Sequence, residues 1–222
     1  MVIDDIGLWC EFGAADFAAR PALFLDRDGV IIADTNYLAR PQDLRMIEGA
    51  AAAIARCNAR GIPVVVVTNQ SGIARRYYGW DDFRAVQTAL TAALAGFGAH
   101  LDAVLACGYH GEGHEPLRMA DHPWRKPNPG MILAAARRMK LDLPWSWIIG
   151  DRPGDLAAGA AAGLAGGTLV ASDDRLRREA APLASERFIV RTATNLSAAV
   201  AALFESGQLT GPVDSGAFVK VT

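Results

Sequence analysis

The run Val64–Val67 decides more about the fold of this chain than any other stretch. Four consecutive β-branched residues favour an extended strand, and an unbroken apolar run is typical of a strand covered on both faces. Segments with helical spacing precede the run at 48–60 and follow it at 81–95, and Gly61 stands where a helix commonly ends. A strand between two helices predicts a parallel sheet with helices on both faces.

The same alternation continues along the rest of the chain. Other short apolar runs predict strands, and Ala-rich or polar segments with helical spacing predict helices between them. The expected strands are the run from 23 that ends in the carboxylates at 26 and 28, and the segments 101–106, 147–150, 168–170 and 188–190. The further helices are expected at 129–139, after 155, from 173 and at 195–204. No insertion is long enough for a cap domain. The sequence therefore predicts an α/β protein with a Rossmann-like parallel sheet.

Length and composition favour one domain. A chain of 222 residues can bury roughly 70–75% of its unfolded surface in a single core. We expect one domain over 21–208, an N-terminal arm over 1–20 and a loose C-terminal tail over 209–222. In the arm, the apolar side chains expected to pack against the body are Ile6, Leu8, Trp9 and Phe12.

The composition also disfavours several classes of function. A net charge of −2 argues against a nucleic-acid surface, and no run of about 18 strongly apolar residues is present to span a membrane. Asp4 and Asp5, with no basic residue before Arg20, argue against a signal or transit peptide, so a cytoplasmic location is expected. Three widely spaced cysteines predict no disulfide. Nothing in the composition implies a protein partner.

Polar side chains follow three of the predicted strands. Asp26 and Asp28 come after the first, and side chains two residues apart in an extended segment point the same way, so their carboxylates should converge. Thr68 and Asp151 end two other strands, and ligands bind at the carboxyl ends of parallel strands. Mg²⁺ held by Asp26, Asp28 and Asp151 is the predicted occupant. A surface turn is the alternative for the Asp-Arg-Asp-Gly stretch.

These residue types suit phosphoryl transfer. Asp26 can attack phosphorus as a nucleophile, and Asp28 can protonate the leaving alcohol and then activate water. The Thr68 hydroxyl can donate to phosphoryl oxygens, and Lys126 can supply a fixed positive charge, although an ordinary solvated lysine is its alternative. Asp155 is either a partner of this group or a helix cap.

Four motifs, in order, resemble those of the haloacid dehalogenase (HAD) superfamily of aspartate-nucleophile phosphatases. They are DRDGV at 26–30, VVVVTNQSGIAR at 64–75, RKPNPGM at 125–131 and IIGDRPGD at 148–155. The second and third are similar to those of the capless group, which contains enzymes acting on D-glycero-D-manno-heptose 1,7-bisphosphate and on histidinol phosphate. The resemblance covers residues 22–171.

The resemblance implies a Mg²⁺-dependent phosphatase that acts on a small phosphorylated metabolite through an aspartyl-phosphate. It gives catalytic roles to Asp26, Asp28, Thr68 and Lys126, and substrate contacts to Asn69, Gln70, Ser71, Arg75, Arg125 and Arg152. The expected reaction is loss of the 7-phosphate of the heptose bisphosphate, with histidinol phosphate or another sugar phosphate as the alternative. Arg152 departs from the lysine common in the family, which keeps the charge but changes the donor geometry.

Many members of the family also carry zinc on the loop before RKP, with the pattern Cys-x-His, a spacer and Cys-x-Cys. Here the two halves read Cys107-x-Tyr109 and His122-x-Trp124, so two of the four ligand positions are retained. A zinc set that chemistry permits is Cys107, His110, His114 and His122. The alternative is a metal-free loop at 108–128, packed by Tyr109 and Trp124.

Two other classes share parts of the pattern. A receiver-type phosphoacceptor domain has its acidic pair on the first strand and its acceptor aspartate on a middle strand, whereas here Asp-x-Asp comes first and Gly-Asp-x-x-x-Asp last. A nucleic-acid 3′-phosphatase shares the capless architecture. The mildly acidic composition lacks the basic surface that phosphate backbones require, so both classes rank below a small-molecule phosphatase.

Overall fold

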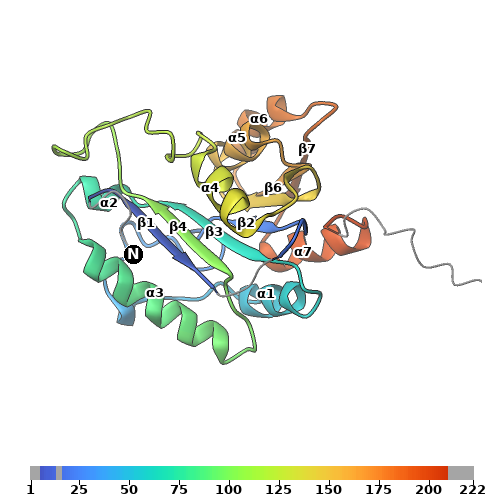
Figure 1. The fold of residues 1–222 in the computed structure, drawn as a ribbon, viewed down its shortest axis with the longest axis horizontal. Coiled ribbons are helices and arrows are strands. Elements are labelled where there is room, and N and C mark those ends of the chain that lie inside the picture. Colours follow the sequence, from blue (N-terminus) through green and yellow to red (C-terminus); the bar gives the residue numbers. More distant parts are fainter. Residues whose placement is uncertain (1–5, 14–16, 210–222) are drawn as a thin grey trace, which may run out of the picture.

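A seven-stranded sheet forms the centre of the protein (Figure 1). The computed structural model describes residues 6–13 and 17–209. The strands lie in the order β1-β4-β3-β2-β5-β6-β7, and all neighbours are parallel except β1, which is antiparallel to β4. Their bounds are Leu8–Phe12 (β1), Leu23–Leu25 (β2), Val64–Asn69 (β3), Ala103–Cys107 (β4), Trp147–Gly150 (β5), Gly166–Val170 (β6) and Ile189–Ala193 (β7).

Helices cover both faces of the sheet, as the sequence predicts (Figure 1). One face packs against α1 (Ala50–Asn58), α3 (Trp80–Ala95) and α7 (Leu196–Glu205). The other packs against α4 (Gly130–Met139), α5 (Pro153–Ala162) and α6 (Asp174–Ala180). The short helix α2 (Ser71–Ala74) follows β3, and single 3₁₀ turns lie at Pro41–Asp43, Leu143–Trp145 and Ala181–Leu183.

The alternation of side chains along the buried strands explains why the apolar runs are unbroken. In β2, Leu23 and Leu25 belong to the core beneath α1, α3 and α7, while Phe24 belongs to the core beneath α4 and α5. The valines of β3 divide between the two cores in the same way. Successive residues of a strand point to opposite faces, so a strand covered twice needs apolar residues at every position.

β2 is the point at which the chain reverses its progress across the sheet. From β2 it moves to one side through β3 and β4, and then crosses to the other side with β5. In open α/β sheets, ligands bind beyond the carboxyl ends of the strands at such a switch point. Asp26 follows the last residue of β2 and therefore stands at this position.

The N-terminal arm differs from the expectation, because residues 8–12 form an edge strand of the sheet. Trp9 is buried and stacks on Trp80, with ring centroids 5.9 Å apart, whereas Ile6 is 41% exposed and does not pack as expected. Five residues are too few to show a clear periodicity. Pairing with β4, from Leu8 opposite Cys107 to Phe12 opposite Ala103, decides the conformation instead.

At the other end of the chain, the predicted tail of 209–222 lies outside the described residues except for Leu209, which is buried. In the portion that the structure describes, no helix combines the length and the apolar character needed to cross a bilayer.

Candidate active site

The turn after β2 places Asp26 at the carboxyl edge of the sheet. The Asp26 amide donates to the carbonyl oxygen of Ile149 on β5 at 3.0 Å, which fixes the start of the turn. Gly29 has a φ of +80°, and a Cβ there would lie 2.6 Å from Asp151 Oδ2. Only glycine combines this left-handed conformation with so close an approach, so Gly29 allows the turn to lie against Asp151.

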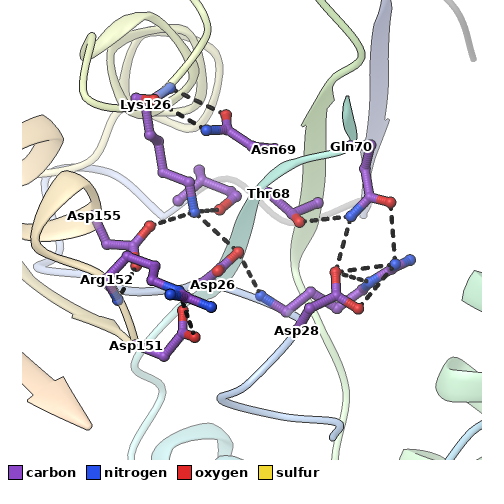
Figure 2. A network of polar contacts seen from close by, with 11 residues as sticks. Asp26, Asp28, Thr68, Asn69, Gln70, Lys126, Asp151, Arg152 and Asp155 are labelled. Atoms are coloured by element: carbon purple, nitrogen blue, oxygen red, sulfur yellow. Dashed lines mark hydrogen bonds and ion pairs between the residues drawn. The ribbon is translucent and has the colours of Figure 1, made fainter. Parts of the chain in front are cut away.

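Lys126 holds the Asp26 carboxylate from the opposite side. Its Nζ lies 2.9 Å from Asp26 Oδ1 and 2.7 Å from Asp155 Oδ1, and it donates to the carbonyl oxygen of Val67 at 2.7 Å (Figure 2). Burial works to lower the pKa of Lys126, but the carboxylates of Asp155 and Asp26 outweigh it and raise the pKa above its usual value. Lys126 is therefore a buried, permanently charged cation at the predicted nucleophile.

Oxygens of Asp26, Asp151 and Asp155 lie within 4.8 Å of one another, close enough to share a metal ion. Burial raises the pKa of Asp26 to about 7, against the opposing effect of Lys126, and burial also raises the pKa of Asp151 to about 6. Oxygen-only donors suit Mg²⁺, and carboxylates crowded in a desolvated site need a cation to stay ionised. The residues present therefore fit Mg²⁺.

Asp155 also holds the local structure together. Its Oδ2 accepts the Arg152 amide at 2.9 Å, which caps the first turn of α5, and its Oδ1 binds Lys126. Both alternatives from the sequence, a helix cap and a partner of the site, thus apply to one side chain.

The Asp28 carboxylate lies apart from this group, although the sequence predicts it beside Asp26 and Asp151. Gln70 Nε2 donates to Asp28 Oδ2 at 2.9 Å, and Arg27 donates to both carboxylate oxygens at 3.2 Å (Figure 2). The physical reason is that β2 ends at Leu25, so the extended geometry that would align side chains two residues apart does not continue to Asp28. Asp155 occupies the place expected for Asp28 in the acidic group.

Asn69 and Gln70, predicted to touch substrate, line the site and also bond to its other residues. Asn69 Oδ1 accepts the Lys126 amide at 3.1 Å and Asn69 Nδ2 donates to the Lys126 carbonyl oxygen at 3.0 Å, so one side chain brackets the lysine backbone. Gln70 is 3% exposed and links Asp28 to Thr68, whose Oγ1 accepts from Gln70 Nε2 at 2.8 Å. Thr68 is itself buried beside Asp26.

A cavity of about 320 Å³ opens above these groups. Four residues of a short flap between β2 and α1 line it, together with Ser71 and Arg152; the four are Asp34, Asn36, Tyr37 and Leu38. Arg152 Nε lies 3.2 Å from Asp151 Oδ2, and its side chain is 58% exposed. The lining also includes Asp26, Arg27, Asp28, Asn69, Gln70, Tyr78, Lys126, Asp151, Gly154 and Asp155.

The other two predicted substrate arginines do not line this cavity. Arg75 Nη2 binds Glu112 at 2.7 Å and approaches His110 Nε2 at 3.4 Å. Arg125 Nη1 donates to the carbonyl oxygen of Tyr109 at 3.0 Å. Arg75 therefore connects the end of α2 to the 108–128 loop, and Arg125 joins two parts of that loop. Contact of either arginine with substrate stays a prediction.

The four residues of the predicted zinc set are not gathered as ligands. Cys107 Sγ and His122 Nδ1 lie 3.9 Å apart, but His122 Nδ1 also accepts the Trp124 amide at 3.1 Å. His110 Nδ1 accepts the Glu112 amide, and the His114 side chain is exposed. Tyr109 stacks on His122 with ring centroids 4.1 Å apart and an interplanar angle of 3°. In the described residues, side-chain packing holds this loop.

Two residues of the site have no assigned role from the sequence. Arg27 is 1% exposed and contacts both Asp28 and Gln70, and Tyr78 donates to Gln70 Oε1 at 2.6 Å. Arg27 could have been noticed as a cation between two aspartates at the end of an apolar run. Tyr78 had no local signal, because its contact depends on the loop between α2 and α3.

Comparisons with known proteins agree with this geometry. A family model described as haloacid dehalogenase-like hydrolase matches residues 23–91, and one described as HAD-hydrolase-like matches residues 123–196. A D-glycero-beta-D-manno-heptose-1,7-bisphosphate 7-phosphatase of Mesorhizobium japonicum is 51% identical over 74% of this chain and 76% of its own length. The corresponding enzyme of Rhodopseudomonas palustris is 43% identical over 66% and 82%.

Solved structures show the same likeness. The crystal structure of a HAD-like phosphatase from Mesorhizobium loti has a TM-score of 0.74 and 44% identity, and covers 82% of this chain and 93% of that one. A D,D-heptose 1,7-bisphosphate phosphatase from B. bronchiseptica, complexed with magnesium and phosphate, has a TM-score of 0.72 and 31% identity, and covers 84% and 99%.

The sheet with its acidic switch point and buried lysine, together with these relatives, defines a phosphatase of the HAD type without a large cap domain. The chain belongs to the haloacid dehalogenase-like hydrolases, and among them to the family of phosphatases that includes these heptose-bisphosphate enzymes.

Proposed function

We propose that this phosphatase removes the 7-phosphate of D-glycero-D-manno-heptose 1,7-bisphosphate. Relatives named for that reaction match over two thirds or more of their length, at up to 51% identity. The cavity is bounded by a short flap rather than a cap domain, which suits a small phosphorylated metabolite. The ion pair between Lys126 and Asp26, at the carboxyl end of the central strand, is the observation that carries the proposal.

In the first step, a carboxylate oxygen of Asp26 attacks phosphorus and the bond from phosphorus to the sugar oxygen breaks. The Asp28 carboxyl group gives its proton to that oxygen, so the sugar leaves as a neutral alcohol and Asp28 becomes a carboxylate. Lys126 binds Asp26 Oδ1 and the Arg27 amide donates to the same oxygen at 2.8 Å, so the carboxylate is held in one orientation for attack.

In the second step, the Asp28 carboxylate takes a proton from water. The water oxygen forms a new bond to phosphorus, and the bond to Asp26 breaks, which releases inorganic phosphate and restores the starting state. Thr68 Oγ1 accepts from Gln70, so its own hydroxyl proton is left to donate to a phosphoryl oxygen.

Asp26 and Asp151 would hold Mg²⁺. The Asp28 carboxylate, the third ligand predicted from the sequence, is bound by Arg27 and Gln70. When bound, the metal neutralises charge on the carboxylates and on the transferring phosphoryl group. Asp155 is committed to Lys126 and to the cap of α5, and contributes by keeping the lysine in place.

The test is Mg²⁺-dependent release of phosphate from a panel of substrates. The panel holds both anomers of the heptose bisphosphate, histidinol phosphate, other sugar phosphates and a 3′-phosphorylated oligonucleotide. We expect the highest kcat/KM with a heptose bisphosphate and release of one phosphate per molecule. A higher value with histidinol phosphate or the oligonucleotide would overturn the substrate assignment.

A further inference from the structure

Two side chains, Arg27 and Gln70, hold the Asp28 carboxylate, and both are almost wholly buried. Arg27 is 1% exposed and Gln70 is 3% exposed, whereas the Asp28 side chain is 24% exposed toward the cavity. Arg27 is in turn held from α3, because its guanidinium lies over the Phe83 ring at 4.9 Å from the centroid. The position of Asp28 is therefore set by buried partners rather than by solvent.

The Gln70 amide uses all of its hydrogen-bonding capacity. Nε2 donates to Asp28 Oδ2 at 2.9 Å and to Thr68 Oγ1 at 2.8 Å. Oε1 accepts from Tyr78 Oη at 2.6 Å and from Arg27 Nη2 at 3.2 Å. Arginine can only donate, and Asp28 Oδ2 already accepts from Arg27 as well as from Gln70, so the reversed amide would lose bonds at both ends. The amide is thereby fixed in one orientation.

Tyr78 makes the shortest contact of this set. Burial raises the pKa of Tyr78 above its usual value, so its hydroxyl keeps its proton and acts as a donor. A side chain at Gly72 would overlap the Tyr78 ring, so the glycine at the start of α2 leaves room for the ring to reach Gln70. Tyr78 is the donor that a buried Gln70 oxygen requires, in addition to Arg27.

We propose that Tyr78 is a positioning residue for the acid–base step. Its hydroxyl fixes the Gln70 amide, and the amide in turn holds Asp28 at the leaving oxygen and orients Thr68. This inference rests on the proposed role of Asp28, but not on the identity of the sugar. Asp28 has to transfer its proton to the leaving oxygen. Loss of the fixed orientation of the Gln70 amide should therefore slow most the reactions whose leaving group needs that proton.

The dependence on leaving group separates this role from a structural one. A sugar alcohol is a poor leaving group and needs protonation, whereas p-nitrophenolate leaves without it. Tyr78→Phe removes one hydroxyl and keeps the ring. We expect kcat for the sugar phosphate to fall about tenfold, and kcat for p-nitrophenyl phosphate to change less than about twofold, with KM unchanged for both.

A matched control is Tyr77→Phe, since the Tyr77 ring is 58% exposed and lies outside the cavity lining. It should leave both rates near wild type. A double-mutant cycle then asks whether Tyr78 acts through Gln70. In a Gln70→Ala background, Tyr78→Phe should have no further effect on the ratio of the two rates.

Equal losses on both substrates, or additive losses in the cycle, would overturn the positioning role. The thermal melt of each variant detects loss of folding separately. The Gln70→Ala variant gives a second measurement of the ratio between the rates on the sugar phosphate and on p-nitrophenyl phosphate. If wild-type enzyme hydrolyses p-nitrophenyl phosphate but not the heptose bisphosphate, the substrate assignment fails alone. The ratio is then taken with an alkyl phosphate that the enzyme does accept.

Discussion

Lys126 Nζ lies 2.9 Å from Asp26 Oδ1, and the two side chains are only 4% and 13% exposed. Lys126 belongs to the 108–128 loop, which is far from Asp26 in the sequence. Its backbone is hydrogen-bonded to the side chain of Asn69 at the end of β3. The proposed nucleophile and its counter-charge are thus held at the ends of two adjacent strands, β2 and β3. A charge pair in so little solvent keeps its geometry between turnovers, which is what attack on phosphorus requires.

Replacing Asp26 should abolish turnover. Asp26→Asn removes the nucleophilic oxygen and a metal charge, so kcat should fall about 10⁴-fold or more. Phosphate release under saturating substrate and Mg²⁺ measures the loss. Asp174→Asn, at a side chain that is 76% exposed on α6, is the matched control and should keep full activity. Substantial residual activity in Asp26→Asn would exclude the covalent mechanism.

Replacing Asp28 should reveal its role through the leaving group. Asp28→Asn keeps one acceptor oxygen for its neighbours but supplies no carboxyl proton, so the sugar phosphate should lose far more activity than p-nitrophenyl phosphate. The ratio of kcat/KM for the two substrates is the measurement. Losses of the same size on both would remove Asp28 from the acid role.

The elements that could be predicted from the sequence are those in which the polarity of each residue matches its burial. The run Val64–Val67 and the short strand before Asp26 are apolar at every position, and this is enough to indicate a doubly covered sheet and its acidic edge. For Asp155, the cap of α5 could be predicted because it is a local contact, whereas the ion pair with Lys126 joins distant segments and could not.

The parts that could not be predicted depend on contacts between distant segments. Residues 8–12 become a strand only through pairing with β4, and the Asp28 carboxylate turns toward Gln70 because β2 stops after three residues. Tyr78 reaches the same glutamine from a loop whose path no local pattern specifies. Short segments and side-chain rotamers are set by tertiary contacts, which override local propensity.

The stability of the metal-free protein should fall as the pH rises toward neutrality. Burial raises the pKa of Asp26 to about 7 and that of Asp151 to about 6, both above the unfolded value near 4. Between about pH 4 and pH 7 the folded state therefore binds more protons than the unfolded chain, and the free energy of unfolding decreases with pH.

Mg²⁺ should reverse this effect, because it binds the ionised carboxylates in competition with protons. We expect the rise in Tm on adding Mg²⁺ to be larger at pH 7.5 than at pH 5.5, in melts of chelator-treated protein. Asp151→Asn should remove most of the rise. An equal rise at both pH values would show that Mg²⁺ does not bind at these carboxylates.

Removing the buried lysine should destabilise the protein in a way that depends on pH. Lys126→Met leaves the buried carboxylates of Asp26 and Asp155 without their cation, a change that costs about 3 kcal/mol at pH 7.5. Burial raises the pKa of Asp26 to about 7, so at pH 5 this carboxylate takes up a proton and the cost should shrink. Urea unfolding at the two pH values measures both, with Lys140→Met, at an exposed position, as control. A cost that is independent of pH would mean that packing, rather than charge, is lost.

The 108–128 loop should keep its structure without zinc. Its order is accounted for by the stack of Tyr109 on His122 and by the bonds of Arg125 to Tyr109 and of Arg75 to Glu112. These contacts offset the entropy of ordering a long loop. Protein purified without chelator should therefore contain no stoichiometric zinc by elemental analysis, and a zinc-selective chelator should leave its Tm unchanged.

The same loop gives a positive measurement. His122→Ala removes the ring that Tyr109 stacks on, and should lower the stability by about 1–2 kcal/mol while Cys107→Ser has a smaller effect. His122 accepts hydrogen bonds from the backbone amides of Trp124, through its ring, and Arg125, through its carbonyl oxygen. Loss of the ring should therefore also loosen the position of Lys126 and reduce kcat. Stoichiometric zinc that disappears in Cys107→Ser would instead establish a metal site at Cys107 and its neighbouring histidines, and would replace packing as the reason the loop is ordered.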